Sequence, residues 1–108
     1  MEVTITEKEN ASVVALNGDL DYQSYHDLES SVDVLVGQGR SPIVLDLSAV
    51  PHIDSVGLGT IVRLWKTASQ KKLALALAGP RKNVRAMINL VNLDGRIKLF
   101  DDVDAASG

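Results

Sequence analysis

The chain begins with two short apolar segments separated by polar residues. Val3 and Ile5 alternate with threonines, and residues 12–16 form a second apolar segment after the polar residues 8–10. Alternation with a period of two is typical of a strand with one buried face, and two such strands joined by a short polar turn form a hairpin. The pattern therefore predicts an antiparallel hairpin at the start of a sheet.

Three later segments have apolar residues three and four positions apart, which is the spacing of one helix face. They comprise Leu28, Val32, Leu35 and Val36; Leu58, Ile61, Val62, Trp65 and Ala68; and Val84, Met87, Ile88 and Val91. Before the first segment, both Ser24 and Asp21 are residues that commonly begin a helix, and the choice between them stays open. Each segment predicts an amphipathic helix packed on a sheet.

Two nearly continuous apolar runs lie between these helices, at residues 43–47 and 73–78. Runs of this kind are typical of strands that are covered on both faces. Ile97 and Leu99 suggest a last short strand, and the tail, 101–108, is expected either to form a further helical turn or to fray. The order of elements predicts an α/β protein with a mixed sheet, opened by a hairpin and flanked by about four helices.

The predicted core draws on both the strands and the helices. We expect it to contain Leu45, Val62, Trp65, Leu75 and Ile88. Leu64 lies off the apolar stripe of its helix and is expected to be exposed. It is then either an ordinary surface leucine or part of the apolar centre of a partner-binding surface.

Composition narrows the classes of function. The chain has 108 residues and a formal net charge of −3, with no run of lysine or arginine, so it lacks the basic surface that nucleic acid requires. It has no cysteine, and its two histidines, His26 and His52, are isolated, so a metal site has little support and no cofactor is expected. With no visible signal peptide and no long apolar stretch, we expect one cytoplasmic domain over residues 1–108 and no membrane insertion.

The segment from Asp46 to Gly59 is the most informative part of the chain. A buried strand ends, a loop follows, and Ser55 occupies the first turn of a helix. Either Asp54 or Ser55 is suited to cap that helix, and Gly57 and Gly59 allow another backbone to approach closely. A helix start also tolerates a phosphate, because its free N–H groups and its dipole favour negative charge.

These residues give the chain a resemblance to the STAS family. The strand Ile43-Val-Leu-Asp-Leu-Ser, the stretch Ile53-Asp-Ser-Val-Gly-Leu-Gly and the loop Gly18-Asp-Leu-Asp look like the family's strand and signature loops. The resemblance extends over essentially the whole chain and implies a STAS fold.

The resemblance also implies a function, that of an anti-sigma factor antagonist. Such a protein binds a GHKL-type serine kinase that holds a sigma factor, is released when the kinase phosphorylates it, and is restored by a PP2C-type phosphatase. Ser55 occupies the position of the phosphorylated serine, while Asp21 and Asp54 match the acidic residues of the two loops. Val56 departs from the small or hydroxyl residue of many relatives, and its bulk could crowd access to Ser55.

The expected partner-binding surface contains Asp21, Asp54, Val56, Gly57 and Leu64, with Ser55 as the phosphorylation site. Ser55, Asp21 and Asp54 could instead serve only as helix caps. An alternative function is that of a scaffold or accessory subunit, in a stressosome-like or lipid-transporter complex, in which Ser55 is never phosphorylated. We expect no enzyme activity, because the titratable residues are scattered and no catalytic motif surrounds Ser55.

Overall fold

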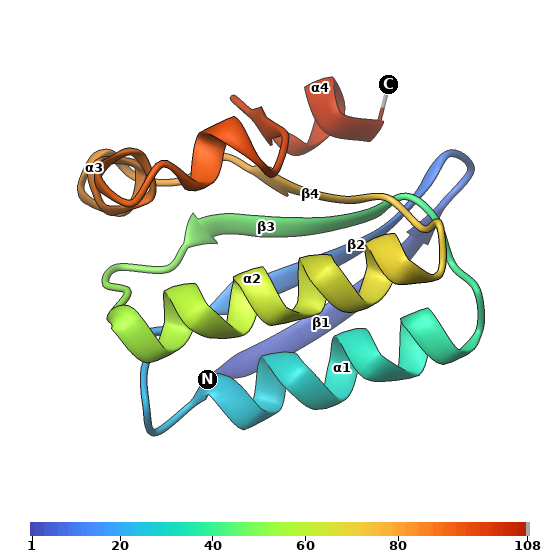
Figure 1. Ribbon diagram of the computed structural model, residues 1–108, viewed down its shortest axis with the longest axis horizontal. Coiled ribbons are helices and arrows are strands. Elements are labelled where there is room, and N and C mark those ends of the chain that lie inside the picture. The colour runs from blue at the N-terminus through green and yellow to red at the C-terminus, as the bar shows by residue number, and fades with distance from the viewer. Residues whose placement is uncertain (108) are drawn as a thin grey trace.

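The computed structural model describes residues 1–107, which form a five-stranded sheet with helices on both faces (Figure 1). The strands are β1 (Glu2–Lys8), β2 (Ala11–Asn17), β3 (Ile43–Ala49), β4 (Leu75–Ala78) and β5 (Leu99–Phe100). They lie side by side in chain order; β1 pairs antiparallel with β2, and each later pair is parallel. The predicted mixed sheet opened by a hairpin is confirmed.

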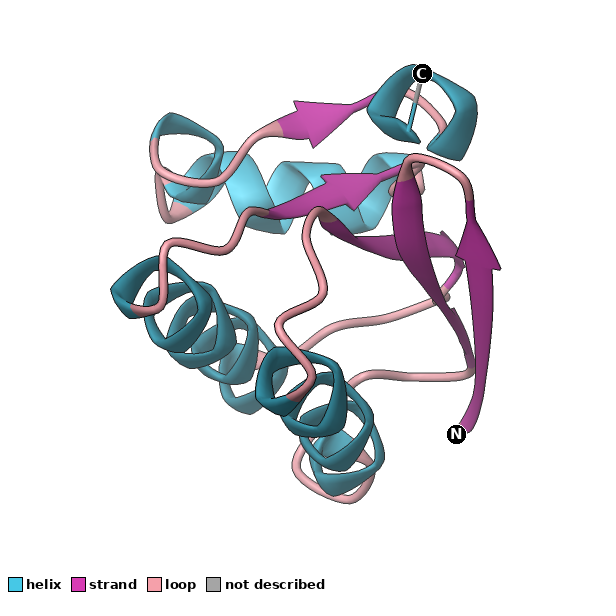
Figure 2. Ribbon diagram, turned by 90° about the vertical axis from the view of Figure 1, so that its right-hand side faces the viewer, coloured by secondary structure: helices cyan, strands magenta, loops and turns pink. Residues whose placement is uncertain are grey.

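Within residues 1–107, four α-helices accompany the sheet. They are α1 (Tyr25–Gly37), α2 (Ser55–Gln70), α3 (Lys82–Leu90) and α4 (Val103–Ser107), with a short 3-10 helix at Leu93–Gly95. Two long helices, α1 and α2, pack together against one face of the sheet, whereas the short α4 lies on the other side (Figures 1 and 2). Within the described residues the tail forms a helical turn at Val103–Ser107, and Gly108 lies outside them.

The core has two parts, one on each face of the sheet. The larger part lies under α1, α2 and α3 and contains the predicted residues Leu45, Leu75 and Ile88. On the opposite face, a smaller cluster that includes Val44 packs against Val103 of α4 and neighbouring side chains. The central strand β3 is thus buried from both sides, as its nearly continuous apolar sequence predicted.

The buried face of α2 differs from the predicted one. Leu64, which was expected to be exposed, is completely buried, so the prediction that it is exposed is wrong. Its predicted place on a partner-binding surface stays a prediction that this burial does not favour. Val62 and Trp65, which were expected in the core, are only partly buried at its margin. The buried stripe is Gly57, Leu58, Ile61, Leu64 and Ala68, in steps of three and four residues. The helix is rotated toward Leu64 relative to the prediction.

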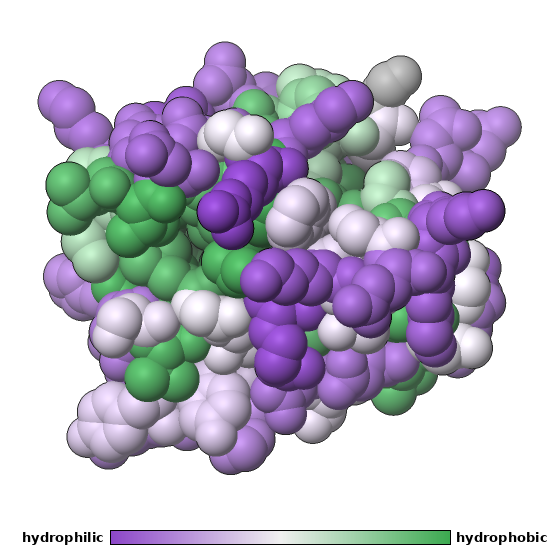
Figure 3. Space-filling model, viewed as in Figure 1, coloured by the Kyte–Doolittle hydropathy of each residue, from purple (hydrophilic) through white to green (hydrophobic). Residues whose placement is uncertain are grey.

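The apolar face of α3 ends earlier than its sequence suggested. Val84 and Ile88 are buried as expected, but Met87 is only partly buried and Val91 is 52% exposed. The helix ends at Leu90, so Val91 follows its last turn and does not continue the buried stripe. Leu90 and Val91 lie on the surface, and an apolar area covers the region of α3 at the left of Figure 3.

Within residues 1–107, no helix combines the length and the apolar character needed to cross a membrane.

Candidate functional site

Two loops meet at one end of the sheet, after the carboxyl ends of β2 and β3 (Figure 1). The backbone N–H of Leu20 donates to the carbonyl of His52 at 3.0 Å, and the N–H of Asp54 donates to the carbonyl of Leu20 at 3.2 Å. Leu20 and Ile53 thereby form an isolated parallel bridge. This bridge holds the two loops side by side.

Asp54 links the second loop both to α2 and to the first loop. Its Oδ1 accepts a hydrogen bond from the N–H of Gly57 at 2.8 Å, and its Oδ2 accepts one from the N–H of Tyr22 at 3.1 Å. Asp54 has extended backbone angles at the N-cap position of α2. The structure therefore selects Asp54, and not Ser55, as the residue that caps the helix.

Capping by Asp54 leaves the hydroxyl of Ser55 available. Ser55 is the first residue of α2, its side chain is exposed, and Oγ has no hydrogen-bond partner within the described part of the chain. The N–H of Leu58 donates to the carbonyl of Asp54, but the N–H groups of Ser55 and Val56 have no acceptor among residues 1–107. Ser55 thus combines an accessible hydroxyl with two unused backbone donors beside it.

Val56 is exposed next to Ser55. Its side chain is 39% exposed and extends the surface at the start of α2. The bulk of this residue therefore lies on the outside, beside the serine, where it is accessible to another protein.

Gly57 has a packing role inside the fold. It is buried, and a Cβ at this position would overlap the carbonyl oxygen of Leu20 and lie 2.9 Å from Leu20 Cγ. The first turn of α2 therefore packs directly on the backbone of the first loop. The prediction that Gly57 allows close backbone approach is confirmed. Its predicted place on the partner-binding surface stays a prediction, which its burial against Leu20 does not favour.

Asp21 organises the first loop. Its Oδ1 accepts hydrogen bonds from the N–H of Gln23 at 3.0 Å and from the hydroxyl of Ser24 at 3.1 Å. Ser24 occupies the N-cap position of α1, but its side chain makes no capping bond to that helix; its hydroxyl also contacts the carbonyl of Asp19 at 2.6 Å. Asp21 and Ser24 thus hold the turn that carries Tyr22.

No pattern in the sequence pointed to Tyr22. Its side chain is 64% exposed, and its N–H is the group that Asp54 holds across the two loops. The feature that sets Tyr22 apart is its hydrogen bond to Asp54, and these two residues are 32 positions apart. Local sequence patterns do not reveal a contact over that separation.

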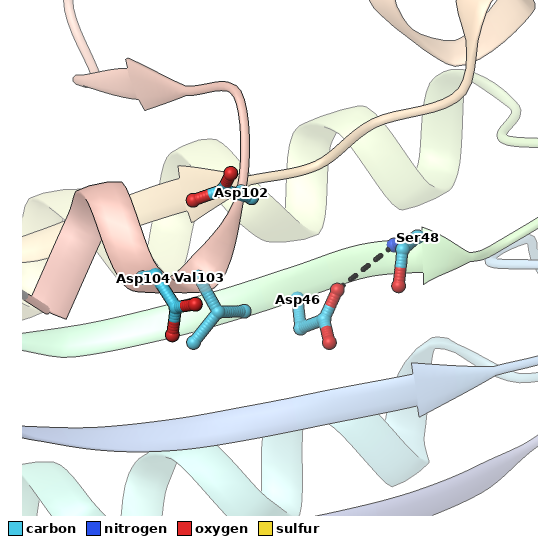
Figure 4. Close-up of a pocket in the computed structure, with 5 residues that line it drawn as sticks. All are labelled: Asp46, Ser48, Asp102, Val103 and Asp104. Atoms are coloured by element: carbon cyan, nitrogen blue, oxygen red, sulfur yellow. Dashed lines mark hydrogen bonds between the residues drawn. The ribbon is translucent and has the colours of Figure 1, made fainter.

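A separate cavity of about 290 Å³ lies between β3 and α4, lined by Asp46, Ser48, Asp102, Val103 and Asp104 (Figure 4). Asp46 Oδ1 accepts a hydrogen bond from the N–H of Ser48 at 3.0 Å. Within residues 1–107, no group of three or more histidine, aspartate or glutamate side chains is arranged to hold a metal ion.

Substitution of Asp54 should show its structural contribution. We expect Asp54→Ala to lower the free energy of unfolding by about 1 to 2 kcal/mol, because a helix cap and the link to Tyr22 are lost. Asp54→Asn should cost less, because asparagine is an equally good cap. Urea unfolding measures both, with the exposed Asp33→Ala as the control for the loss of one negative charge. Equal stability of Asp54→Ala and Asp33→Ala would contradict this account.

Known proteins resemble this chain over nearly its full length. The model of the STAS domain family matches residues 2–106. A Thermotoga maritima protein, provisionally named an anti-sigma factor antagonist, is 34% identical over 83% of this chain and 80% of its own length. The anti-sigma-F factor antagonist RsfB of Mycobacterium tuberculosis is 29% identical over 98% of this chain and 87% of its own.

The fold is also shared with a solved structure. The crystal structure of a Thermotoga maritima protein, again a provisional anti-sigma factor antagonist, has a TM-score of 0.86 and 32% sequence identity. The match covers 96% of this chain and 90% of that one. The similarity therefore extends over nearly the whole fold.

Proposed function

The chain belongs to the STAS domain family, and on that premise we propose that it is an anti-sigma factor antagonist controlled by phosphorylation of Ser55. In the unphosphorylated form it binds an anti-sigma serine kinase of the GHKL type and so releases a sigma factor. Its role is regulatory binding and not catalysis. The observation that carries the proposal is the free, exposed hydroxyl of Ser55 at the start of α2.

The environment of Ser55 suits a phosphate acceptor. Asp54 supplies the helix cap, so a kinase can use the serine hydroxyl without breaking a bond that holds the fold. Once attached, a phosphate lies close to the unused N–H groups of Ser55 and Val56 and to the positive end of the helix dipole. The folded state therefore accommodates the modified residue without rearrangement.

The same phosphate is expected to oppose binding. It adds a charge of about −1.5 to −2 next to Asp54, on a surface formed with the loop of Asp21. A charge that is buried at an interface without a partner costs several kcal/mol. Phosphorylation can thus dissociate the complex by a local electrostatic effect, and a PP2C-type phosphatase restores binding by removing it.

The proposal is tested by phosphorylation of the purified protein. The protein is incubated with ATP and each of the organism's GHKL-type serine kinases in turn, and mass spectrometry measures the phosphate added. One of these kinases should add a single phosphate to the parent protein and none to Ser55→Ala. The matched control is Ser69→Ala, which removes another exposed serine hydroxyl from the far end of α2 and should leave phosphorylation unchanged.

Binding provides the second measurement. Ser55→Asp should weaken the kinase complex at least about tenfold, or 1.4 kcal/mol, whereas Ser55→Ala should remain bound. A phosphate on another residue, or tight binding by Ser55→Asp, would refute the switch. A scaffold in which Ser55 is never modified would then be the better interpretation.

A further inference from the structure

Tyr22 is the most exposed aromatic side chain next to the candidate site. It is 64% exposed, on the turn between β2 and α1. Its side chain is absent from both apolar clusters of the core, whereas Tyr25, three residues later, packs against the larger one. The exposure of Tyr22 is therefore not explained by packing within the described residues.

The backbone that carries Tyr22 is held from two sides. On one side, the carboxylate of Asp21 and the hydroxyl of Ser24 fix the turn through hydrogen bonds of 3.0 to 3.1 Å. On the other side, Asp54 Oδ2 accepts the N–H of Tyr22 itself at 3.1 Å. The aromatic ring thus projects from a turn whose backbone is fixed relative to the start of α2.

Physical chemistry favours an interaction role for a residue placed in this way. A tyrosine side chain has a large apolar surface and loses little conformational entropy when it binds, and tyrosine is enriched among the residues that dominate interface energies. A turn that is already ordered reduces the entropy cost further. Val56, 39% exposed at the start of α2, adds a second apolar group to the same two-loop surface.

We infer that Tyr22 determines affinity and specificity for the kinase partner, by inserting its ring into an apolar pocket of that protein beside the region that receives Ser55. The inference rests on the proposed function and goes beyond it, because it assigns the main apolar contact to the first loop. Asp54 acts as a positioning residue for this contact through its bond to the N–H of Tyr22.

The test is a binding measurement with purified GHKL-type serine kinases of the organism, each with a non-hydrolysable ATP analogue so that Ser55 stays unmodified. Tyr22→Ala should raise the Kd at least about tenfold, whereas Tyr22→Phe, which keeps the ring, should stay within about threefold of the parent. With ATP, Tyr22→Ala should raise the KM for phosphorylation of Ser55 more than it lowers kcat. Thermal unfolding should change little, because the side chain is exposed.

The matched control is Val34→Ala, which trims an apolar side chain that is 56% exposed near the other end of α1 and should leave the Kd unchanged. If Tyr22→Ala binds like the parent while Ser55→Asp is weakened, the role of Tyr22 is overturned and the proposed function stands. An equal loss in Tyr22→Phe overturns insertion of the ring. If the parent binds none of the kinases, the proposed function fails and this inference fails with it.

Discussion

Replacing Leu64 with alanine is expected to lower the free energy of unfolding by about 3 kcal/mol. The side chain is completely buried in the larger core cluster, under the middle of α2. Its removal loses the transfer free energy of the apolar atoms and leaves a cavity between the helix and the sheet, and such changes cost about 2 to 5 kcal/mol. Chemical denaturation followed by the fluorescence of Trp65, the chain's one tryptophan, would measure the loss.

The same substitution at Leu90 serves as the control. Leu90 is 78% exposed at the end of α3, so Leu90→Ala should change the stability by no more than about 0.5 kcal/mol. The two variants remove identical atoms, and only their burial differs. Similar stabilities would mean that Leu64 lies on the surface, as the apolar pattern of the sequence suggested.

Replacing Gly57 with alanine is expected to cost about 2 to 3 kcal/mol, although alanine is the better helix former. The new methyl group would overlap the carbonyl oxygen of Leu20, and backbone atoms cannot turn aside as a flexible side chain can. The start of α2 or the first loop must then move, which is the usual origin of the penalty for overpacking. Because that loop carries Asp21 and Tyr22, kinase binding should weaken as well.

Gly59, two residues further along the same helix, provides the contrast. Apart from the adjoining residues and the backbone of α2 itself, a Cβ there meets no atom of residues 1–107 within 4 Å. Gly59→Ala should therefore stabilise the protein by about 0.5 to 1 kcal/mol through helix propensity alone. Thermal unfolding of both variants checks the prediction. A destabilising Gly59→Ala, or a neutral Gly57→Ala, would show that the helix start and the first loop are not packed as described.

The candidate site was only partly predictable. The position of Ser55 at a helix start followed from the sequence, since a buried strand, a loop and an apolar helical stripe bracket it. Two residues with suitable side chains adjoin that start, and either could have capped it. The choice of Asp54 depends on Tyr22, which is 32 residues away and donates to the second carboxylate oxygen.

The sequence by itself determined the order of the elements, the hairpin, the strands buried on both faces and the loop that carries Ser55. These follow from local periodicity and from which residues favour turns and caps, and each is readable within a few neighbouring positions. The tertiary structure alone decided which side of α2 is buried and which loop residues meet. The apolar residues of α2 cover more than one face of the helix, so the sequence pattern allows either Leu64 or Trp65 to face the core. Two tertiary contacts fix the rotation of α2 about its axis. They are the contact of Gly57 with Leu20 and the packing of the whole helix against the sheet.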